Sequence, residues 1–185
     1  MLDVKLIKKS DSKFIKEIIE LGRKFFGDDV EKIKACIQCG TCTGGCPSAR
    51  RTAWRTRMLF RKAQMGLKEE ALTSDDLWCC TTCYTCQERC IRSIPTTDLV
   101  RIIRNIAFSE GKGIQPAHVA VCGYLARFGH AVPINDETKA VRKKVGLNEI
   151  PPTVHSYPEG VEELNIIMKE TGFDKKVKKL QEEKK

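Results

Sequence analysis

Two runs of four cysteines with the same spacing constrain this chain more than any other feature. Both read C-x2-C-x2-C-x3-C, and together they use eight of the ten cysteines in the 185-residue chain. The first run comprises Cys36, Cys39, Cys42 and Cys46, and the second comprises Cys80, Cys83, Cys86 and Cys90. A repeated run of thiols at this density indicates a metal or cluster site around which the rest of the chain packs.

This spacing is the one with which bacterial two-cluster ferredoxins bind [4Fe–4S] clusters. Three cysteines at i, i+3 and i+6 reach three irons of a cubane, and the fourth cysteine of each run crosses to the other cluster. We therefore predict two clusters, the first bound by Cys36, Cys39, Cys42 and Cys90 and the second by Cys80, Cys83, Cys86 and Cys46. Gly40, Gly44 and Gly45 relieve the crowding of backbone around a cluster, because glycine accepts positive φ at little cost. Pro47 turns the chain away from the site.

Zinc and disulfides are the alternative uses of these cysteines. Structural zinc sites pair two C-x2-C knuckles across a longer loop, and three cysteines within seven residues fit them poorly. Residues 1–20 carry charges throughout and lack the apolar stretch of a signal peptide. We therefore expect a cytoplasmic protein, and disulfides are rare in that reducing compartment.

Charge and hydropathy exclude further classes of protein. The formal net charge is +9, and two clusters with four thiolates each would reduce it to about +5. The basicity is therefore weak support for nucleic-acid binding. No stretch approaches 18 apolar residues, so no membrane-spanning helix is expected.

The apolar periodicity predicts an all-α fold, since no segment shows the alternation of a strand. Ser10, Asp11 and Ser12 are candidate N-caps for the first helix. Thr96 and Thr97 are candidate N-caps for the helix near residue 100. Thr73-x-x-Asp76 resembles a capping box for a short helix. The longer helices are expected at residues 12–26, 48–65, 97–110, 116–128, 135–145 and 159–171. We predict an N-terminal helical arm (1–28), a cluster-binding domain (29–130) and a C-terminal helical extension with a charged tail (131–185).

Several residues outside the cysteine runs are candidates for other roles. Arg50, Arg51, Arg55, Arg57 and Arg61 crowd one stretch, and no acidic residue occurs between Glu31 and Glu69. That stretch binds an acidic partner, tunes the cluster potential or is a solvated helix face. Cys79 and Cys122 are expected to be buried apolar residues. His118 and His130 have no companion ligands and are expected to be structural.

The helical setting of the two runs resembles the α-helical ferredoxin family, to which several redox-complex subunits belong. Within it, the segments Glu137-Thr-Lys-Ala-Val-Arg-Lys-Lys-Val-Gly-Leu147 and Ile150-Pro-Pro-Thr-Val-His-Ser-Tyr-Pro158 are similar to the family of iron–sulfur C subunits of soluble heterodisulfide reductases from methanogenic archaea. The resemblance extends over roughly residues 10 to 173. One departure is that no proline directly follows Cys90.

The resemblance implies an electron-transfer subunit of an oxidoreductase complex with no active site of its own. In that family, electrons pass from a flavin- and iron–sulfur-containing subunit through this subunit to a third, which reduces the disulfide of coenzyme M and coenzyme B. The reaction is coupled to flavin-based electron bifurcation, with a hydrogenase or formate dehydrogenase in the larger complex. The residues agree with a non-catalytic role. The chain has no Gly-rich dinucleotide fingerprint, and Cys79-Cys80 is followed by Thr81 where the disulfide-reducing subunit has Cys-Cys-Gly.

Three other functions remain open at this point. An iron–sulfur subunit of another dehydrogenase or of a quinone-linked reductase would share every ligand. A cluster-stabilised nucleic-acid-binding module is favoured only by the arginine-rich stretch, where aromatic residues for base stacking are sparse. A freely diffusing ferredoxin would not need the long helical segments at both ends.

Overall fold

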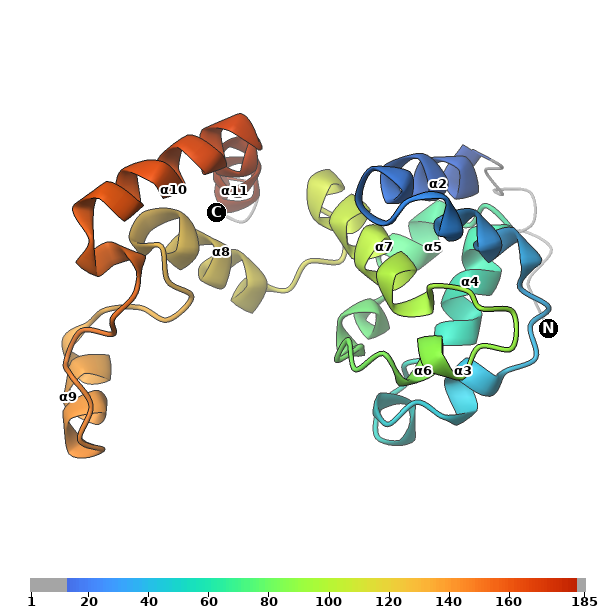
Figure 1. Ribbon diagram of the computed structural model, residues 1–185, viewed down its shortest axis with the longest axis horizontal. Coiled ribbons are helices and arrows are strands. Elements are labelled where there is room, and N and C mark those ends of the chain that lie inside the picture. Colours follow the sequence, from blue (N-terminus) through green and yellow to red (C-terminus); the bar gives the residue numbers. More distant parts are fainter. Residues whose placement is uncertain (1–12, 183–185) are drawn as a thin grey trace. The chain divides into compact units, whose positions relative to one another are not determined.

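The computed structural model describes residues 13–182, and every regular element in that range is a helix (Figure 1). The predicted all-α class is therefore confirmed. With η for a 3-10 helix, the elements are α2 (Lys13–Phe26), η1 (Asp28–Ala35), α3 (Thr41–Gly44), η2 (Ser48–Arg50), α4 (Thr56–Gln64), α5 (Lys68–Leu72), η3 (Asp75–Cys79), α6 (Thr85–Glu88), α7 (Thr96–Glu110), α8 (Pro116–Phe128), α9 (Asp136–Lys144), η4 (Val154–Ser156), α10 (Pro158–Glu170) and α11 (Phe173–Glu182). The predicted caps Ser10, Asp11 and Ser12 lie outside the described residues.

The chain divides into two compact units, residues 1–114 (unit 1) and residues 115–185 (unit 2). From the sequence we predicted a domain boundary after residue 130 and a separate N-terminal arm of residues 1–28. In the structure α2 belongs to unit 1, because it buries Phe14 and Ile18 and packs on α7. All eight cysteines of the two runs lie in unit 1.

The core of unit 1 is built around α7. Its residues Leu99, Ile102 and Ile103 are completely buried, and α2, η1, η3, α5 and α6 pack around it. At the contact of α2 with η1, a Cβ on Gly22 would lie 3.0 Å from a methyl group of Val30, so only glycine fits without a shift. Truncating a buried aliphatic residue such as Ile103 to alanine costs about 2–5 kcal/mol. This core holds the short helices of the cysteine runs in place.

The helix predicted at residues 48–65 is broken in the structure. Only η2 and α4 are helical, and Arg55 between them is extended, with φ of −140° and ψ of 94°. The Arg55 guanidinium donates to the carbonyls of Ala49, Thr52 and Trp54 at 3.0, 2.8 and 2.7 Å. These bonds satisfy carbonyls that a continuous helix would otherwise use, and the Trp54 side chain beside the break is buried in the core.

The predicted capping box at Thr73 is also wrong. Thr73 is the C-cap of α5, and its hydroxyl donates to the Glu69 carbonyl at 2.8 Å. The following helix, η3, begins after Ser74, and no side chain caps it. The Thr73 hydroxyl therefore bonds to the end of α5 and does not cap the start of η3.

Unit 2 consists of α8, α10 and α11 packed together, with α9 on a loop between α8 and η4. The predicted ends of α8 and α9 agree with the structure: Gly129 is left-handed with φ of 65°, and the Asn135 side chain accepts from the Thr138 N–H at 2.8 Å in a capping box. Val177 and Leu180 of the charged tail are buried on α11, which packs on α8. Within residues 13–182, none of the helices has both the length and the apolarity that crossing a bilayer requires.

Candidate cluster-binding site

The two cysteine runs fold into the same local structure. Each run enters a four-residue helix, α3 or α6, through a residue in the left-handed region: Gly40 with φ of 86° and Tyr84 with φ of 62°. Gln38 and Thr82, two residues earlier, are also left-handed, with φ of 61° and 53°. Two short helices of matching form that pack on each other therefore present matching cysteines.

Tyr84 shows that glycine is not essential at this turn. A non-glycine residue held in the left-handed region costs on the order of 1–3 kcal/mol and persists only where its surroundings enforce it. The Tyr84 hydroxyl donates to Asp98 on α7 at 3.0 Å and accepts from Arg101 at 3.2 Å. These contacts anchor the second run on α7. At the same position the first run has Gly40, which adopts positive φ without such contacts.

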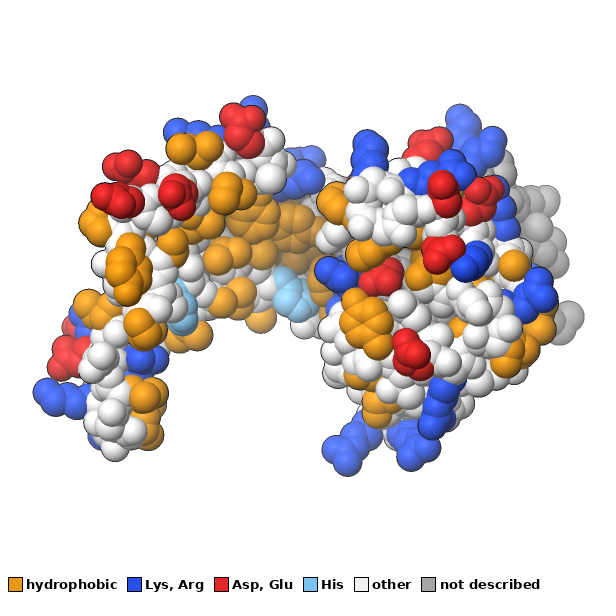
Figure 2. All heavy atoms as spheres, viewed as in Figure 1, with side chains coloured by type: hydrophobic (Ala, Val, Ile, Leu, Met, Phe, Trp, Pro, Cys, Tyr) orange, Lys and Arg blue, Asp and Glu red, His pale blue; other side chains and the backbone are white. Residues whose placement is uncertain are grey.

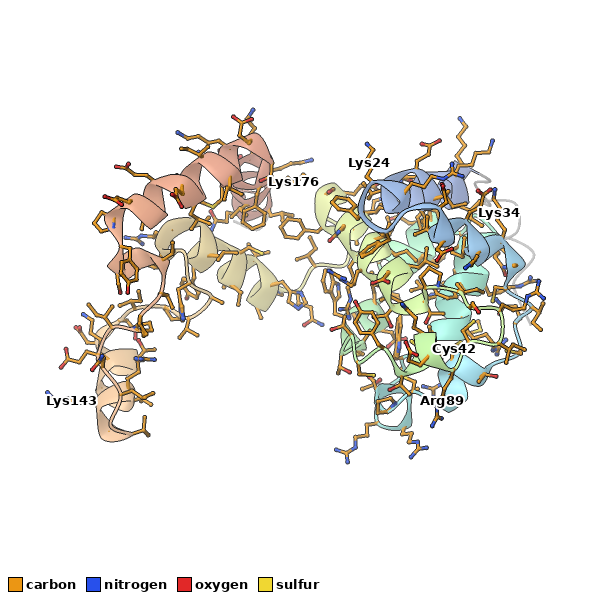
Figure 3. The ribbon with its side chains drawn as sticks, viewed as in Figure 1. Lys24, Lys34, Cys42, Arg89, Lys143 and Lys176 are labelled. Atoms are coloured by element: carbon orange, nitrogen blue, oxygen red, sulfur yellow. The ribbon has the colours of Figure 1, made fainter. Side chains whose placement is uncertain are left out.

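The four cysteines predicted for the first cluster line a single small cavity. Cys36, Cys39 and Cys42 come from the first run, and Cys90 comes from the end of the second. Phe60 and Ile94 contribute apolar walls, while Arg57 and Arg92 line the cavity as cations. Cys42 points into the unit (Figure 3), and the Arg89 side chain of the second run lies against Gly45 of the first, where an added Cβ would meet Arg89 Nη1 at 2.7 Å.

The Cys46 and Cys86 thiols of the second predicted set lie near the Cys80 thiol. Burial raises the pKa of the Cys80 thiol, and the nearby Cys86 and Cys46 thiols raise it further. Cys46 and Cys86 are both buried, at 7% exposure each. Cys46, which follows α3, therefore lies near Cys80 of the second run, and α3 packs on α6. Cys83 is the exposed member of this set.

Hydroxyl and amide groups surround the cysteine sulfurs. The Thr96 hydroxyl donates to Cys86 Sγ at 3.1 Å, and the Thr97 hydroxyl lies 3.5 Å from the same sulfur. In the first set, the Gln38 amide donates to Cys36 Sγ at 3.4 Å and the Ile94 N–H donates to Cys90 Sγ at 3.4 Å. Such donors stabilise the negative charge of thiolate ligands and of a cluster bound to them.

Thr96 and Thr97 correct a prediction made from sequence. They were expected to cap α7, but the N-cap position is Pro95, and both threonines lie inside the helix, almost completely buried. Their hydroxyls lie against the Cys86 sulfur instead of capping the backbone of the helix start.

Thr41 and Thr85, each two positions after the second cysteine of its run, contact a cysteine sulfur and were not singled out from the sequence. A side-chain hydrogen bond between Cys39 and Thr41 lowers the pKa of Cys39, and one between Cys83 and Thr85 lowers the pKa of Cys83. By contrast, burial raises the pKa of Cys42 to about 11. The signal was present in the sequence, because both runs read Cys-x-Thr-Cys at this point.

Arg104 is a second residue that the sequence did not single out. Its guanidinium donates to the carbonyls of Leu77 at 2.9 Å and Cys80 at 2.6 Å, and it lies over the Trp78 ring at 5.4 Å. Burial lowers the pKa of Arg104, but an arginine remains charged because its ordinary pKa exceeds about 12. A half-buried cation is therefore fixed beside the second cysteine set.

Of the other candidate residues, Arg57 alone lines the cavity of the first cysteine set. Cys79 is half-buried against the core, and Cys122 is half-buried in α8, where burial raises its pKa. Neither is the fully buried apolar residue that was expected. Of the five arginines, Arg57 lines the first cavity. Arg55 donates to backbone carbonyls, including that of Ala49. The cavity is not lined by Arg50, Arg51 or Arg61. The His130 ring nitrogen Nδ1 accepts from the Val132 N–H at 3.1 Å.

The residues present fit [4Fe–4S] clusters. Each cubane binds four thiolates at four separate irons, and the two sets supply four thiols each. Among residues 13–182, no three His, Cys, Asp or Glu side chains are close enough to hold one metal ion, whereas the first set surrounds a cavity. Charge-stabilising hydrogen bonds reach Cys36, Cys86 and Cys90.

Comparison with known proteins agrees with this interpretation of the site. Residues 32–94 match the family model of a 4Fe-4S dicluster domain. The chain is 50% identical over 163 residues to the iron-sulfur C subunit of the CoB–CoM heterodisulfide reductase of Methanopyrus kandleri, covering 88% of this chain and 84% of that protein. It is 51% identical over 159 residues to the C subunit of the H(2):CoB-CoM heterodisulfide,ferredoxin reductase of Methanothermobacter thermautotrophicus, covering 86% and 84%.

A third relative, whose name includes ferredoxin, is also similar over most of its length. It is the C subunit of the Ferredoxin:CoB-CoM heterodisulfide reductase of Methanosarcina mazei, 46% identical over 142 residues, which cover 77% of this chain and 87% of that protein. With a dicluster domain in unit 1 and identities of this size over most of both chains, the chain belongs to the family of iron–sulfur C subunits of heterodisulfide reductase.

Proposed function

We propose that this chain is the electron-transfer subunit of a heterodisulfide reductase and carries electrons through two [4Fe–4S] clusters. The observation that carries the proposal is the meeting of both cysteine runs at each site: Cys90 joins the first set at the cavity, and Cys46 joins the second beside Cys80. Each bound cluster would accept and return one electron. The chain itself supplies thiolate ligands and hydrogen bonds to sulfur.

Crossed ligation gives this arrangement a structural consequence. Because each site takes ligands from both runs, each cluster would tie α3 to α6 and would fix the separation between the two sites. The free energy of cluster binding would then contribute to the folding stability of this part of unit 1. A relay requires this rigidity, since the electron donor and acceptor must stay at a fixed spacing while the charge on each site changes.

The proposed partners follow from the family. We assign the electron donor to a flavin- and iron–sulfur-containing subunit of the reductase and the acceptor to a disulfide-reducing subunit, where the disulfide of coenzyme M and coenzyme B is reduced. The relatives' names mention H(2), formate and ferredoxin, which supports coupling by flavin-based bifurcation and a hydrogenase or formate dehydrogenase in the larger complex. We place the protein in the cytoplasm, where thiols remain reduced before the clusters are assembled.

The test is to purify the chain without oxygen, both by itself and together with the flavin-containing and disulfide-reducing subunits. We expect eight irons and eight inorganic sulfides per chain, and electron exchange with reduced methyl viologen. The isolated chain should not reduce the coenzyme M–coenzyme B disulfide, whereas the assembled subunits should. Turnover by this chain without partners, or a fully loaded chain that leaves the activity of the other two subunits unchanged, would contradict the proposal.

A further inference from the structure

The cavity of the first cysteine set is lined by positive charge without negative charge. Among the described residues that line it, Arg57 and Arg92 are the charged ones. Within residues 13–182, neither arginine forms an ion pair with a carboxylate. The sequence agrees, because no acidic residue occurs between Glu31 and Glu69. Figure 2 shows Lys and Arg side chains projecting from the end of unit 1 at which α3 and α6 lie.

The position of Arg57 is set by the packing of α4 on α3. Its backbone N–H donates to the Thr43 hydroxyl at 3.0 Å. Its side chain lies over the turn at Gly40, where a Cβ would be 3.7 Å from Arg57 Cδ and 3.9 Å from Nε. Gly40 is the left-handed residue between Cys39 and Cys42. The half-buried Arg57 side chain therefore rests on the backbone of the first run.

The matching turn of the second run has no unpaired cation. Tyr84 stands there in place of Gly40. The Tyr84 hydroxyl contacts Asp98 and Arg101. Those two side chains form an ion pair at 3.4 Å, so their charges offset each other. The two runs have the same local backbone structure but differ in the charge at this turn.

An unpaired cation at the cavity would act on the charge of a bound cluster. A [4Fe–4S] cluster with four thiolates gains one negative charge when it is reduced. A fixed positive charge stabilises the reduced state more than the oxidised state, and the effect grows as the distance and the effective dielectric constant fall. Arginine suits this role, because its guanidinium is always protonated in proteins. The chain thus places a permanent positive charge where it raises the reduction potential.

We propose that Arg57 and Arg92 set the reduction potential of the first cluster. Arg57 is the larger contributor, because it is the less exposed of the two. This inference rests on the proposed function, since it takes the first cysteine set to hold a [4Fe–4S] cluster. Of the uses open to the arginine-rich stretch, it assigns tuning of the cluster potential to Arg57.

The test is a redox titration of the anaerobically prepared, cluster-loaded full chain, followed by electron paramagnetic resonance. Arg57→Gln and Arg92→Gln each remove one cation of the cavity, whereas Arg57→Lys keeps the charge. Arg61→Gln is the matched control, because Arg61 is exposed one turn further along α4 and does not line the cavity. Iron content and circular dichroism establish that each variant is loaded and folded.

We expect Arg57→Gln to reduce the equilibrium constant for one-electron reduction of the first cluster about tenfold, which is a fall in potential of ~59 mV. Arg92→Gln should move the same potential in the same direction by less, since a more exposed charge is screened more strongly. Arg57→Lys should keep most of the wild-type potential, and Arg61→Gln should leave it unchanged. The second cluster should move less than the first in every variant.

Three results would overturn the proposal. The first is an unmoved potential of the first cluster in loaded Arg57→Gln. The second is an equal fall in Arg61→Gln, which would reflect the net charge of the chain. The third is an equal fall in Arg57→Lys, which would show that packing on Gly40 and not charge is responsible. If Arg57→Gln does not load its clusters, Arg92→Gln decides, and an unchanged first potential there overturns the proposal.

Iron and sulfide analysis of the wild-type chain separates this inference from the proposed function. A wild-type chain that binds zinc, or a single cluster, overturns the proposed function, and this inference falls with it. A chain with two complete clusters whose first potential does not respond to Arg57 or Arg92 overturns this inference alone.

Discussion

Replacing Arg104 by Met should selectively change the second cluster site. Methionine keeps most of the length and apolar volume of the side chain but removes the guanidinium, which donates to the carbonyls of Leu77 and Cys80. Hydrogen bonds to charged groups contribute about 1.5–3 kcal/mol each, and partial access of water to the freed carbonyls lowers the net cost. We expect the free energy of unfolding to fall by about 3 kcal/mol in Arg104→Met and by less in Arg104→Lys.

The same substitution should lower the reduction potential of the second cluster. Cys80 is a predicted ligand, and its carbonyl oxygen lies 2.6 Å from Arg104 Nη2. Covalent geometry then places the guanidinium within about 10 Å of a cluster on Cys80. A unit charge at about 10 Å contributes about 1.7 kcal/mol at an effective dielectric constant of about 20, or about 70 mV for one electron. Removing the cation destabilises the more negative reduced state, so the potential falls.

The assay is a redox titration followed by electron paramagnetic resonance, which resolves the two clusters. The first cluster serves as the internal control, and Arg61→Met is the matched variant, because Arg61 is an exposed arginine on α4 that does not line the first cavity. We expect Arg104→Lys to retain most of the potential, since it keeps the charge. Equal shifts of both clusters, or no shift of the second, would refute the reasoning.

Three smaller perturbations test other parts of the structure. Gly113→Ala should destabilise unit 1 by more than about 1 kcal/mol in denaturant titrations, because φ is +60° there and a Cβ would clash with the Leu72 backbone; an unchanged midpoint would argue against this backbone. Thr96→Val should lower the potential of the second cluster, because it removes the hydroxyl on Cys86; a rise would show that the bond does not act on the cluster. In the apo chain, Cys39 should react with iodoacetamide at lower pH than Cys42, because its pKa is lowered while burial raises the other to about 11, so the thiolate of Cys39 forms first as pH rises; peptide mass spectrometry that finds the reverse order would contradict these environments.

The sequence predicted the helices whose signals are local. The apolar face of α7 repeats at helical spacing, and left-handed glycines at Gly111 and Gly129 end α7 and α8 where the pattern stops. The break after η2 was missed, because it depends on Arg55 bonding three carbonyls and on Trp54 entering the core, and neither contact is visible in a residue pattern.

The cysteine sets remain a prediction, which rests on spacing because spacing limits how thiols can reach a cluster. The groups around them were not predictable from the sequence, because they act across the fold. Arg104 reaches the Cys80 carbonyl from a helix 24 residues away in sequence, and Thr96 reaches Cys86 from the first turn of the same helix. At Tyr84 the local preference for glycine is overridden by a hydrogen bond to α7. These tertiary contacts set the charge and hydrogen bonding around the cysteine sulfurs, whereas the local sequence pattern predicts only which cysteines are candidate ligands.

Crossed ligation of two clusters is the central claim, and Cys90→Ser tests it most directly. Cys90 belongs to the second run in sequence but lies at the cavity with Cys36, Cys39 and Cys42. Mössbauer and electron paramagnetic resonance spectra of the anaerobically prepared variant, with selective comparison to Cys46→Ser, show which cluster loses a thiolate. We predict that Cys90→Ser damages the cluster held by residues 36–42 and leaves the cluster at residues 80–86 with its full thiolate set. Damage confined to the cluster at residues 80–86 would contradict the account, because each run would then supply its own fourth ligand.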